Sequence, residues 1–168
     1  MAAVRDAILI RRATSRDEPF LLEMLYEALF VAPGDTPFPR SVLDDPQIAR
    51  YVRGYGRQGD AGLVAEASDG SPIGAAWVRR FTDGDQGYAY VDDDAPELSI
   101  AIVATHRRMG VGTELLTKLI AEVPRCSLSA DRRNPAVRLY ERLGFEIVER
   151  SGDSLTMVHD NQALNTVL

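Results

Sequence analysis

The chain has 168 residues, of which 45% are hydrophobic, and its formal net charge is −6. This composition is typical of a globular protein and excludes a disordered chain. The acidic balance argues against sequence-independent binding of nucleic acid, which needs a basic surface, and is compatible with cationic or neutral small partners or with solubility alone. The longest apolar runs fall well short of the roughly 18–20 residues that span a bilayer.

The first residues lack the apolar core of a signal peptide. With one cysteine, Cys126, and two histidines, the chain has no internal disulfide and a poor donor set for a Cys/His zinc site. We therefore expect a cytoplasmic protein that binds no metal, no membrane and no nucleic acid.

The first half of the chain predicts one strand, two helices and a meander of strands. A capping-box pattern, "SRDE", begins at Ser15, and leucines recur at helical spacing behind it. Asp69-Gly70 marks the turn between two later strands. The expected strands cover residues 7–12, 62–67 and 73–81, with "YAYV" (88–91) as an extension of the sheet, and the expected helices begin at residue 15 and at about residue 41, the second ending near residue 55.

The second half alternates strands and helices. An apolar strand over 97–103 leads into a helix that starts after Gly112 and ends at Pro124. A strand over 126–130 follows, then a helix that Asn134 caps and Gly144 terminates. Two final strands, 145–151 and 155–160, form a hairpin. This order predicts a single α/β domain over 1–168 with a mixed sheet, of which 161–168 is a short tail.

The segment "HRRMGVGTEL" carries the clearest chemical signal. A P-loop would need Gly-Lys-Ser/Thr, and a dinucleotide fingerprint would need a glycine where Leu115 stands. The remaining pattern, Arg107-x-x-Gly110-x-Gly112, lets backbone N–H groups approach an anion at a helix N-terminus. It predicts a pyrophosphate-binding loop, and the alternative is a tight turn with surface arginines.

Two motifs resemble those of the GNAT superfamily of N-acetyltransferases. The segment from Arg107 to Gly112 is similar to the family's acyl-CoA pyrophosphate loop. The segment Asn134…Tyr140…Leu143-Gly144-Phe145 is similar to its second CoA-side motif, and the order of elements agrees over essentially the whole chain.

The resemblance implies a fold, a co-substrate and a site. The fold would be an α/β, mostly antiparallel mixed sheet of about seven strands flanked by about four helices and splayed between the fourth and fifth strands. Acetyl-CoA would be the donor for direct transfer to a primary amine. Its expected binding residues are Ile102, Val103, Ala104, Arg107, Arg108, Met109, Gly110, Val111, Gly112, Thr113, Asn134 and Tyr140.

The expected catalytic residues are Tyr140 and Glu97. The resemblance places the Tyr140 hydroxyl by the CoA sulfur as proton donor, whereas an ordinary half-buried tyrosine is the alternative. Glu97 matches the glutamate that many members use as general base, and the alternative is a surface carboxylate. The backbone N–H of Ile102 would meet the thioester oxygen, and the strand edge at Ile102-Val103 would pair with pantetheine, whereas a buried core strand is the alternative.

Acidic residues before the fourth strand, at 83, 85 and 92–94, predict a cationic acceptor, unless they form only a solvated loop. Two other classes stay open: a non-catalytic CoA-binding or regulatory module, and a nucleotide-using or carbon–sulfur enzyme on a similar α/β plan. Dimers are common among proteins of this resemblance, so we also expect a homodimer.

Overall fold

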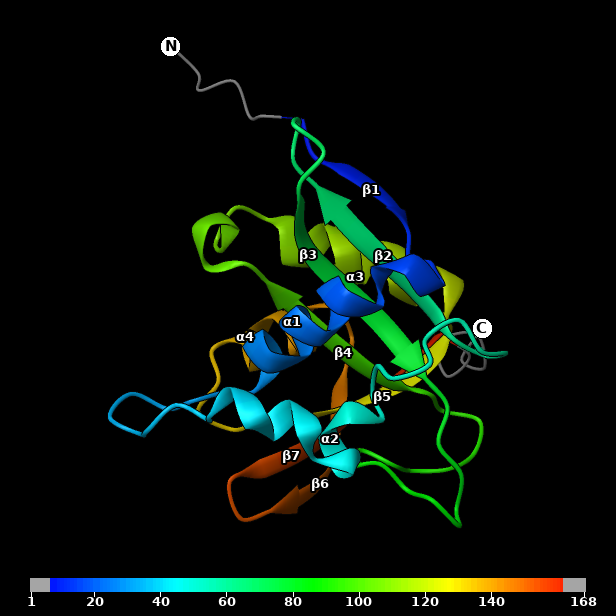
Figure 1. The fold of residues 1–168 in the computed structure, drawn as a ribbon. Helices are drawn as coiled ribbons and strands as arrows, with labels where there is room; N and C mark the ends of the chain where they lie inside the picture. Colours follow the sequence, from blue (N-terminus) through cyan, green and yellow to red (C-terminus); the bar gives the residue numbers. More distant parts are fainter. Residues whose placement is uncertain (1–6, 162–168) are drawn as a thin grey trace.

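The computed structural model describes residues 7–161, and Figure 1 shows how their helices and strands are arranged. In chain order the elements are β1 (Leu9–Arg12), η1 (Ser15–Asp17), α1 (Glu18–Ala28), η2 (Arg40–Asp44), α2 (Pro46–Ala49), β2 (Ala61–Glu66), β3 (Pro72–Arg79), β4 (Glu97–Ile102), η3 (Ala104–His106), α3 (Val111–Glu122), β5 (Arg125–Asp131), α4 (Ala136–Arg142), β6 (Glu146–Ser151) and β7 (Ser154–Asp160). The expected tail beyond Asn161 lies outside the described residues.

The strands form one mixed sheet that opens in its middle. Their order within the described residues is β1-β2-β3-β4-β5-β7-β6. Strands β1 to β4 pair antiparallel, as do β5 with β7 and β7 with β6. The two halves meet only where β4 runs parallel to β5, and that ladder has the single register pair Glu97↔Ser127. The predicted splay between the fourth and fifth strands is therefore confirmed.

Each face of the sheet is covered by its own hydrophobic cluster. Helix α3 packs on one face through Leu115, Leu116 and Leu119, together with side chains of β5 and β7. Helix α1 and the segment after α2 pack on the other face through residues such as Leu21 and Tyr51. Figure 1 shows α1 and α2 in front of the sheet and α3 behind it. Alternate side chains of β4 point to these two clusters, so β4 packs against both layers of the molecule.

Three local expectations need correction. The capping box begins one residue earlier than predicted, because the Asp17 carboxylate accepts the Thr14 N–H (2.7 Å) and the Thr14 side chain caps η1. The helix expected up to residue 55 is broken into η2, α2 and turns, because Asp45, before Pro46, is extended (ψ 119°) and Gly54 adopts φ +73°. Residues 88–91 form a turn and coil rather than a strand.

The other predicted boundaries agree closely with the structure. Asn134 Oδ1 accepts the N–H of Ala136 (2.9 Å) and so caps α4, and Gly144 takes φ +96° after its end. No helix between residues 7 and 161 is both long and apolar enough to cross a membrane.

Candidate active site

The start of α3 directs backbone N–H groups outward from the sheet. Gly110 adopts φ +83°, a left-handed conformation that favours glycine, and the helix begins at the next residue. The first helical hydrogen bond runs from the Glu114 N–H to the Gly110 carbonyl (3.1 Å). The N–H groups of Val111, Gly112 and Thr113 therefore have no acceptor within the helix. Together with the positive end of the helix dipole, they suit an anion such as a pyrophosphate.

The edge of β4 beside the splay carries unpaired backbone groups. The Ser127 N–H donates to the Pro96 carbonyl (3.0 Å), so that carbonyl faces β5. Because backbone groups alternate sides along a strand, the N–H and C=O groups of Ile100 and Ile102 also face β5's side of β4. They lie beyond the only β4–β5 pair, where β5 has diverged. This edge can pair with an amide-rich chain as another strand would.

The two arginines of the loop differ in how they are held. Arg107 Nε donates to the Ile102 carbonyl (2.9 Å), and its Nη2 pairs with Glu27 of α1 (2.8 Å). Arg108 is exposed at φ +62°, and within residues 7–161 its guanidinium has no hydrogen-bond or ion-pair partner. Arg107 therefore ties the end of β4 to α1, whereas Arg108 is the cation that is free to meet a ligand phosphate.

Helix α4 contributes Tyr140, whose side chain is only 8% exposed. Its ring packs against Phe145, with 5.9 Å between the ring centroids. Burial raises the pKa of the Tyr140 hydroxyl to about 12, because the ionised form loses its hydration. The hydroxyl therefore keeps its proton at neutral pH and can serve as an acid but not as a base.

Glu97, at the start of β4, is buried with only 2% of its surface exposed. Its Oε1 accepts hydrogen bonds from the Tyr51 hydroxyl and the Ala89 N–H, both at 2.8 Å. Its Oε2 is buried and has no partner among the described residues. A Cβ at Gly87 would overlap this carboxylate, so the loop packs directly on it. Glu97 is thus a buried group and not the surface carboxylate that was its alternative interpretation.

Burial raises the pKa of the Glu97 carboxyl above its ordinary value, and the hydrogen bonds from Ala89 and Tyr51 oppose that rise. A carboxylate with a raised pKa and one oxygen without a partner is suited to accept a proton. Burial, reinforced by the charge of Glu97, also raises the pKa of Tyr51, so this hydroxyl remains a donor to Glu97.

Strand β3 fixes the segment that carries Tyr51. Trp77 Nε1 donates to the Tyr51 carbonyl (2.9 Å). Arg79, 1% exposed, donates to the carbonyls of Arg50 (3.0 Å) and Arg53 (2.5 Å) and pairs with Asp60 at 2.8 Å. This buried network holds a segment without regular helical structure and so places the Tyr51 hydroxyl on Glu97.

Two cavities meet along β4. The strand cavity, about 340 Å³, extends from Glu97 and Tyr51 past Ser99 to Tyr140. The loop cavity, about 740 Å³, lies beside Arg108, Gly110 and Gly112. Residues that line both are Ala28, Leu29, Phe30, Phe38, Ile100, Asn134 and Tyr140.

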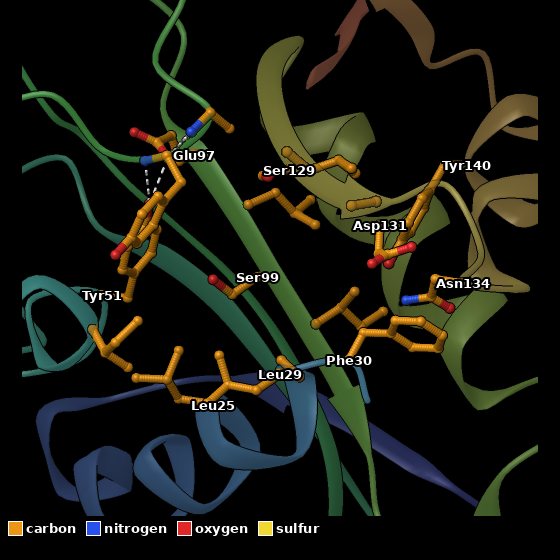
Figure 2. Close-up of a pocket in the computed structure, with 18 of the residues that line it drawn as sticks. Leu25, Leu29, Phe30, Tyr51, Glu97, Ser99, Ser129, Asp131, Asn134 and Tyr140 are labelled. Carbon is orange, nitrogen blue, oxygen red and sulfur yellow. Dashed lines mark hydrogen bonds between the residues drawn. The ribbon is translucent and has the colours of Figure 1, made fainter. Parts of the chain in front are cut away.

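Figure 2 shows the two ends of the strand cavity. Glu97 and Tyr51 lie together at one end, Tyr140, Asp131 and Asn134 lie at the other, and Ser99 of β4 lies between them. The cavity therefore joins a buried carboxylate to a buried phenol through a continuous hollow.

The structure brings most of the predicted site residues to these cavities. The lining includes Glu97, Ile102, Arg107, Arg108, Gly110, Gly112, Thr113, Asn134 and Tyr140. Val111 instead packs in the core at 2% exposure and lines neither of these cavities. Val103 packs against the core, Met109 is exposed, and Ala104 lies in η3. No sequence motif identified Tyr51, Ser99 or Asp131 individually as site residues.

The acidic run 92–94 is engaged outside the cavities. Asp92 pairs with Arg125 (2.5 Å), and Asp93 accepts hydrogen bonds from the Asp83 N–H (3.0 Å) and the Tyr90 hydroxyl. Neither cavity lining, within the described residues, includes any of 92–94, or 83 and 85. The expectation that this run draws a cationic acceptor into the cleft is not supported, and the run acts as a hydrogen-bonded loop.

The motifs indicated an acyl-CoA-dependent acyltransferase. The structure agrees with that class, because its sheet is splayed, the edge of β4 is free beside the splay, and the N-terminus of α3 lies next to it. A model of the acetyltransferase (GNAT) family matches residues 21–145. The chain therefore belongs to the GNAT family of acetyltransferases. No curated protein sequence matches it.

Solved structures of acetyltransferases share the fold. A ribosomal-protein-alanine N-acetyltransferase from Brucella melitensis is 25% identical with a TM-score of 0.61, over 90% of this chain and 99% of that one. A putative acetyltransferase from Salmonella typhimurium, solved with its cofactor acetyl-CoA, is 23% identical with a TM-score of 0.63. The match covers 92% of this chain and 94% of that one. The PaiA N-acetyltransferase from Thermoplasma acidophilum, in complex with coenzyme A, is 17% identical with a TM-score of 0.60. The match covers 92% of this chain and 99% of that one.

Proposed function

We propose that the protein is an acetyl-CoA-dependent N-acetyltransferase that moves an acetyl group directly from the thioester to a primary amine of a small molecule or peptide. The observation that carries this proposal is the junction of the two cavities at Ile100 and Tyr140, because it joins an anion-binding loop to a buried acid and a buried base. Family membership and the fold shared with CoA-bound acetyltransferases support it.

The loop cavity would hold the donor. The N–H groups of Val111, Gly112 and Thr113 would bind the pyrophosphate, with the exposed Arg108 side chain as counter-charge. The backbone groups of Ile100 and the N–H of Ile102 would pair with the pantetheine amides. Arg107 would act indirectly, since it already occupies the Ile102 carbonyl.

The thioester oxygen would be stabilised by a backbone N–H of β4. Both Ile100 and Ile102 direct an N–H into the gap, but only Ile100 lines both cavities. The strand rises about 3.3 Å per residue, so Ile102 lies about 16 Å from Glu97 along β4, and Ile100 about 10 Å. We therefore favour the Ile100 N–H, which brings the reacting carbon closer to the base.

Proton movement would use the two ends of the strand cavity. Glu97 would take the proton that the ammonium must lose, through a water beside Ser99, because the distance along β4 is too long for direct contact. As the new C–N bond forms and the C–S bond breaks, the Tyr140 hydroxyl would give its proton to the leaving thiolate. The raised pKa of Glu97 suits a proton acceptor, and the raised pKa of Tyr140 keeps its hydroxyl protonated at neutral pH.

Release of free thiol from acetyl-CoA, measured over a panel of amino acids, polyamines, aminoglycosides, apolar amines and peptides with free N-termini, tests this function. We expect at least one amine to raise thiol release well above hydrolysis, with mass spectrometry showing an N-acetyl product. Tight acetyl-CoA binding without amine-dependent release would instead identify a non-catalytic CoA-binding module. Absence of binding to any CoA species would overturn the assignment of the loop.

A further inference from the structure

We propose that the acceptor is a small primary amine carried on an apolar, ring-sized body without an acidic group. This inference rests on the proposed function and deepens it, because it concerns the strand cavity, where the acceptor would bind. It follows from three properties of that cavity: its walls, its charges and its size.

The walls of the strand cavity opposite β4 are apolar. They come from α1, from the chain after it, from α2 and from the connection between β3 and β4, and they include Leu25, Leu29, Phe38, Ile48 and Tyr88. Two of them lie at the rim, since Phe38 is 44% and Tyr88 62% exposed. Large apolar side chains left open to water beside a cavity favour a partner that covers them with apolar surface.

The charges of the cavity are of one sign. Among residues 7–161, those that line it include no Lys, Arg or His, and its two carboxylates are Glu97 and Asp131. Arg133 is bound to Asp131 at 2.7 and 2.9 Å and holds the pKa of that carboxyl down at about 2. Asp131 is thus bonded directly to its counter-charge, whereas Glu97 feels the charge of Arg50 without an ion pair and retains an oxygen without a hydrogen-bond partner.

This arrangement selects for one ammonium and against a carboxylate. A single ammonium can be drawn toward Glu97, whereas a bound carboxylate would lose its hydration without meeting a cation. A second ammonium, as in a polyamine, would be placed against the apolar wall. The acidic run that could have received it is bonded to Arg125 and Tyr90 instead.

The volume limits the acceptor to a small body. At about 340 Å³, the strand cavity lies near the lower end of the roughly 300–1,000 Å³ typical of small-molecule sites. One ring with a short aminoalkyl chain fits such a space better than an extended peptide does.

A matched set of four acceptors tests the inference through kcat/KM with acetyl-CoA. The probes are 2-phenylethylamine, phenylalanine, phenylalanine amide and spermidine, of which the first three share one ring and one amine. We expect 2-phenylethylamine to exceed phenylalanine and spermidine by at least about tenfold. Phenylalanine amide should recover most of the loss, because it lacks the carboxylate but keeps the added bulk.

Two variants connect the preference to the cavity. Tyr88→Ala should lower the ratio of kcat/KM for 2-phenylethylamine over ethylamine severalfold, because it removes apolar wall without touching the backbone. The control is Leu9→Ala on β1. Leu9 is 60% exposed and Tyr88 is 62% exposed, but Leu9 lies outside both cavities, so its replacement should leave the ratio unchanged. Ser129→Arg, an exposed lining position, should raise activity with phenylalanine relative to its amide.

The outcomes separate this inference from the proposed function. A best acceptor that is an amino acid, a polyamine or a peptide tenfold better than 2-phenylethylamine would overturn the inference and leave N-acetyl transfer in place. Equal ratios in Tyr88→Ala and the parent would also overturn it. If none of the amines releases thiol although acetyl-CoA binds, both the inference and the proposed function fail.

Discussion

The loop cavity and the strand cavity meet at Tyr140 but are built in different ways. In the loop cavity, the backbone N–H groups suited to bind an anion come from one contiguous stretch, Val111 to Thr113, at the start of α3. The strand cavity takes them from side chains of separate segments, among them Tyr51, Glu97 and Asp131. A ligand bound by backbone groups can be shared across a family, whereas a ligand chosen by side chains changes with each sequence.

The largest effect is expected at Tyr140, which lines both cavities where they meet. Tyr140→Phe removes only the hydroxyl, so we expect turnover to fall roughly ten- to a thousandfold while acetyl-CoA affinity changes little. Steady-state kinetics and calorimetry measure the two effects.

Tyr55→Phe is the matched control for the hydroxyl. Both tyrosines are buried, and desolvation raises the pKa of each to about 12, but Tyr55 lies outside both cavities. Turnover that stays intact in Tyr140→Phe, or falls equally in the two variants, would leave Tyr140 with a packing role only.

The next effect concerns Glu97, at the end of the strand cavity opposite Tyr140. Glu97→Gln should lower turnover about ten- to a hundredfold with little change in acetyl-CoA affinity, because it removes the base and leaves the loop cavity intact. In the parent, the rate should fall as pH drops through the raised pKa of Glu97, and the variant should lose that limb of the profile. An unchanged pH profile in the variant would assign the base elsewhere.

The same shift predicts a stability effect of definite sign. Because burial raises the pKa of Glu97 in the folded state above its unfolded value, the folded state binds more protons between the two values. The stabilising contribution of Glu97 to the free energy of unfolding is therefore largest below the pKa that Glu97 has in the unfolded state. It is lost as pH rises through the pKa that Glu97 has in the folded state. Denaturant unfolding across this range should show a shallower decline in Glu97→Gln than in the parent.

A smaller effect is expected within the loop cavity. Gly110→Val should weaken CoA binding about tenfold, since it strains the loop and places a side chain where the backbone meets the ligand. Gly70→Val is the control, because Gly70 also has φ +83° and open space around it but lies in the β2–β3 turn. Both variants should lose similar stability, and only Gly110→Val should lose affinity. Equal CoA affinities would remove the loop from the binding site.

The contrast between the cavities also explains what the sequence could predict. The loop was predictable because its glycines, arginines and helix start are adjacent in the chain. A continuous apolar run predicted β4, the Asp69-Gly70 turn predicted the first hairpin, and alternation predicted the last one. The position of the splay came from resemblance, not from periodicity. Asn134 was recognisable as a cap because its acceptor role needs only the next few residues.

Contacts between distant segments were not predictable in this way. The hydrogen bond from Tyr51 to Glu97 joins residues 46 apart and starts from a segment of turns where a continuous helix was expected. The Arg107–Glu27 pair joins residues 80 apart, and it changes the role of an arginine that the motif assigned to the ligand. No local pattern encodes such pairs, since each partner alone has the features of an ordinary surface or core residue.

The smallest expected effect separates the two arginines of the loop cavity. Arg108→Gln should weaken CoA binding about two- to fivefold, and the difference from the parent should shrink as salt rises, because it removes an exposed charge that is free to meet a phosphate. Arg107→Gln removes an equal charge, but that charge is already paired with Glu27 at 2.8 Å. Its loss should therefore change affinity less and depend less on salt, and it should weaken pantetheine as much as CoA because it frees the end of β4. Calorimetry with both ligands at two salt concentrations measures this. A larger, salt-dependent loss of CoA affinity in Arg107→Gln than in Arg108→Gln would mean that the Glu27 pair opens to let Arg107 bind the ligand.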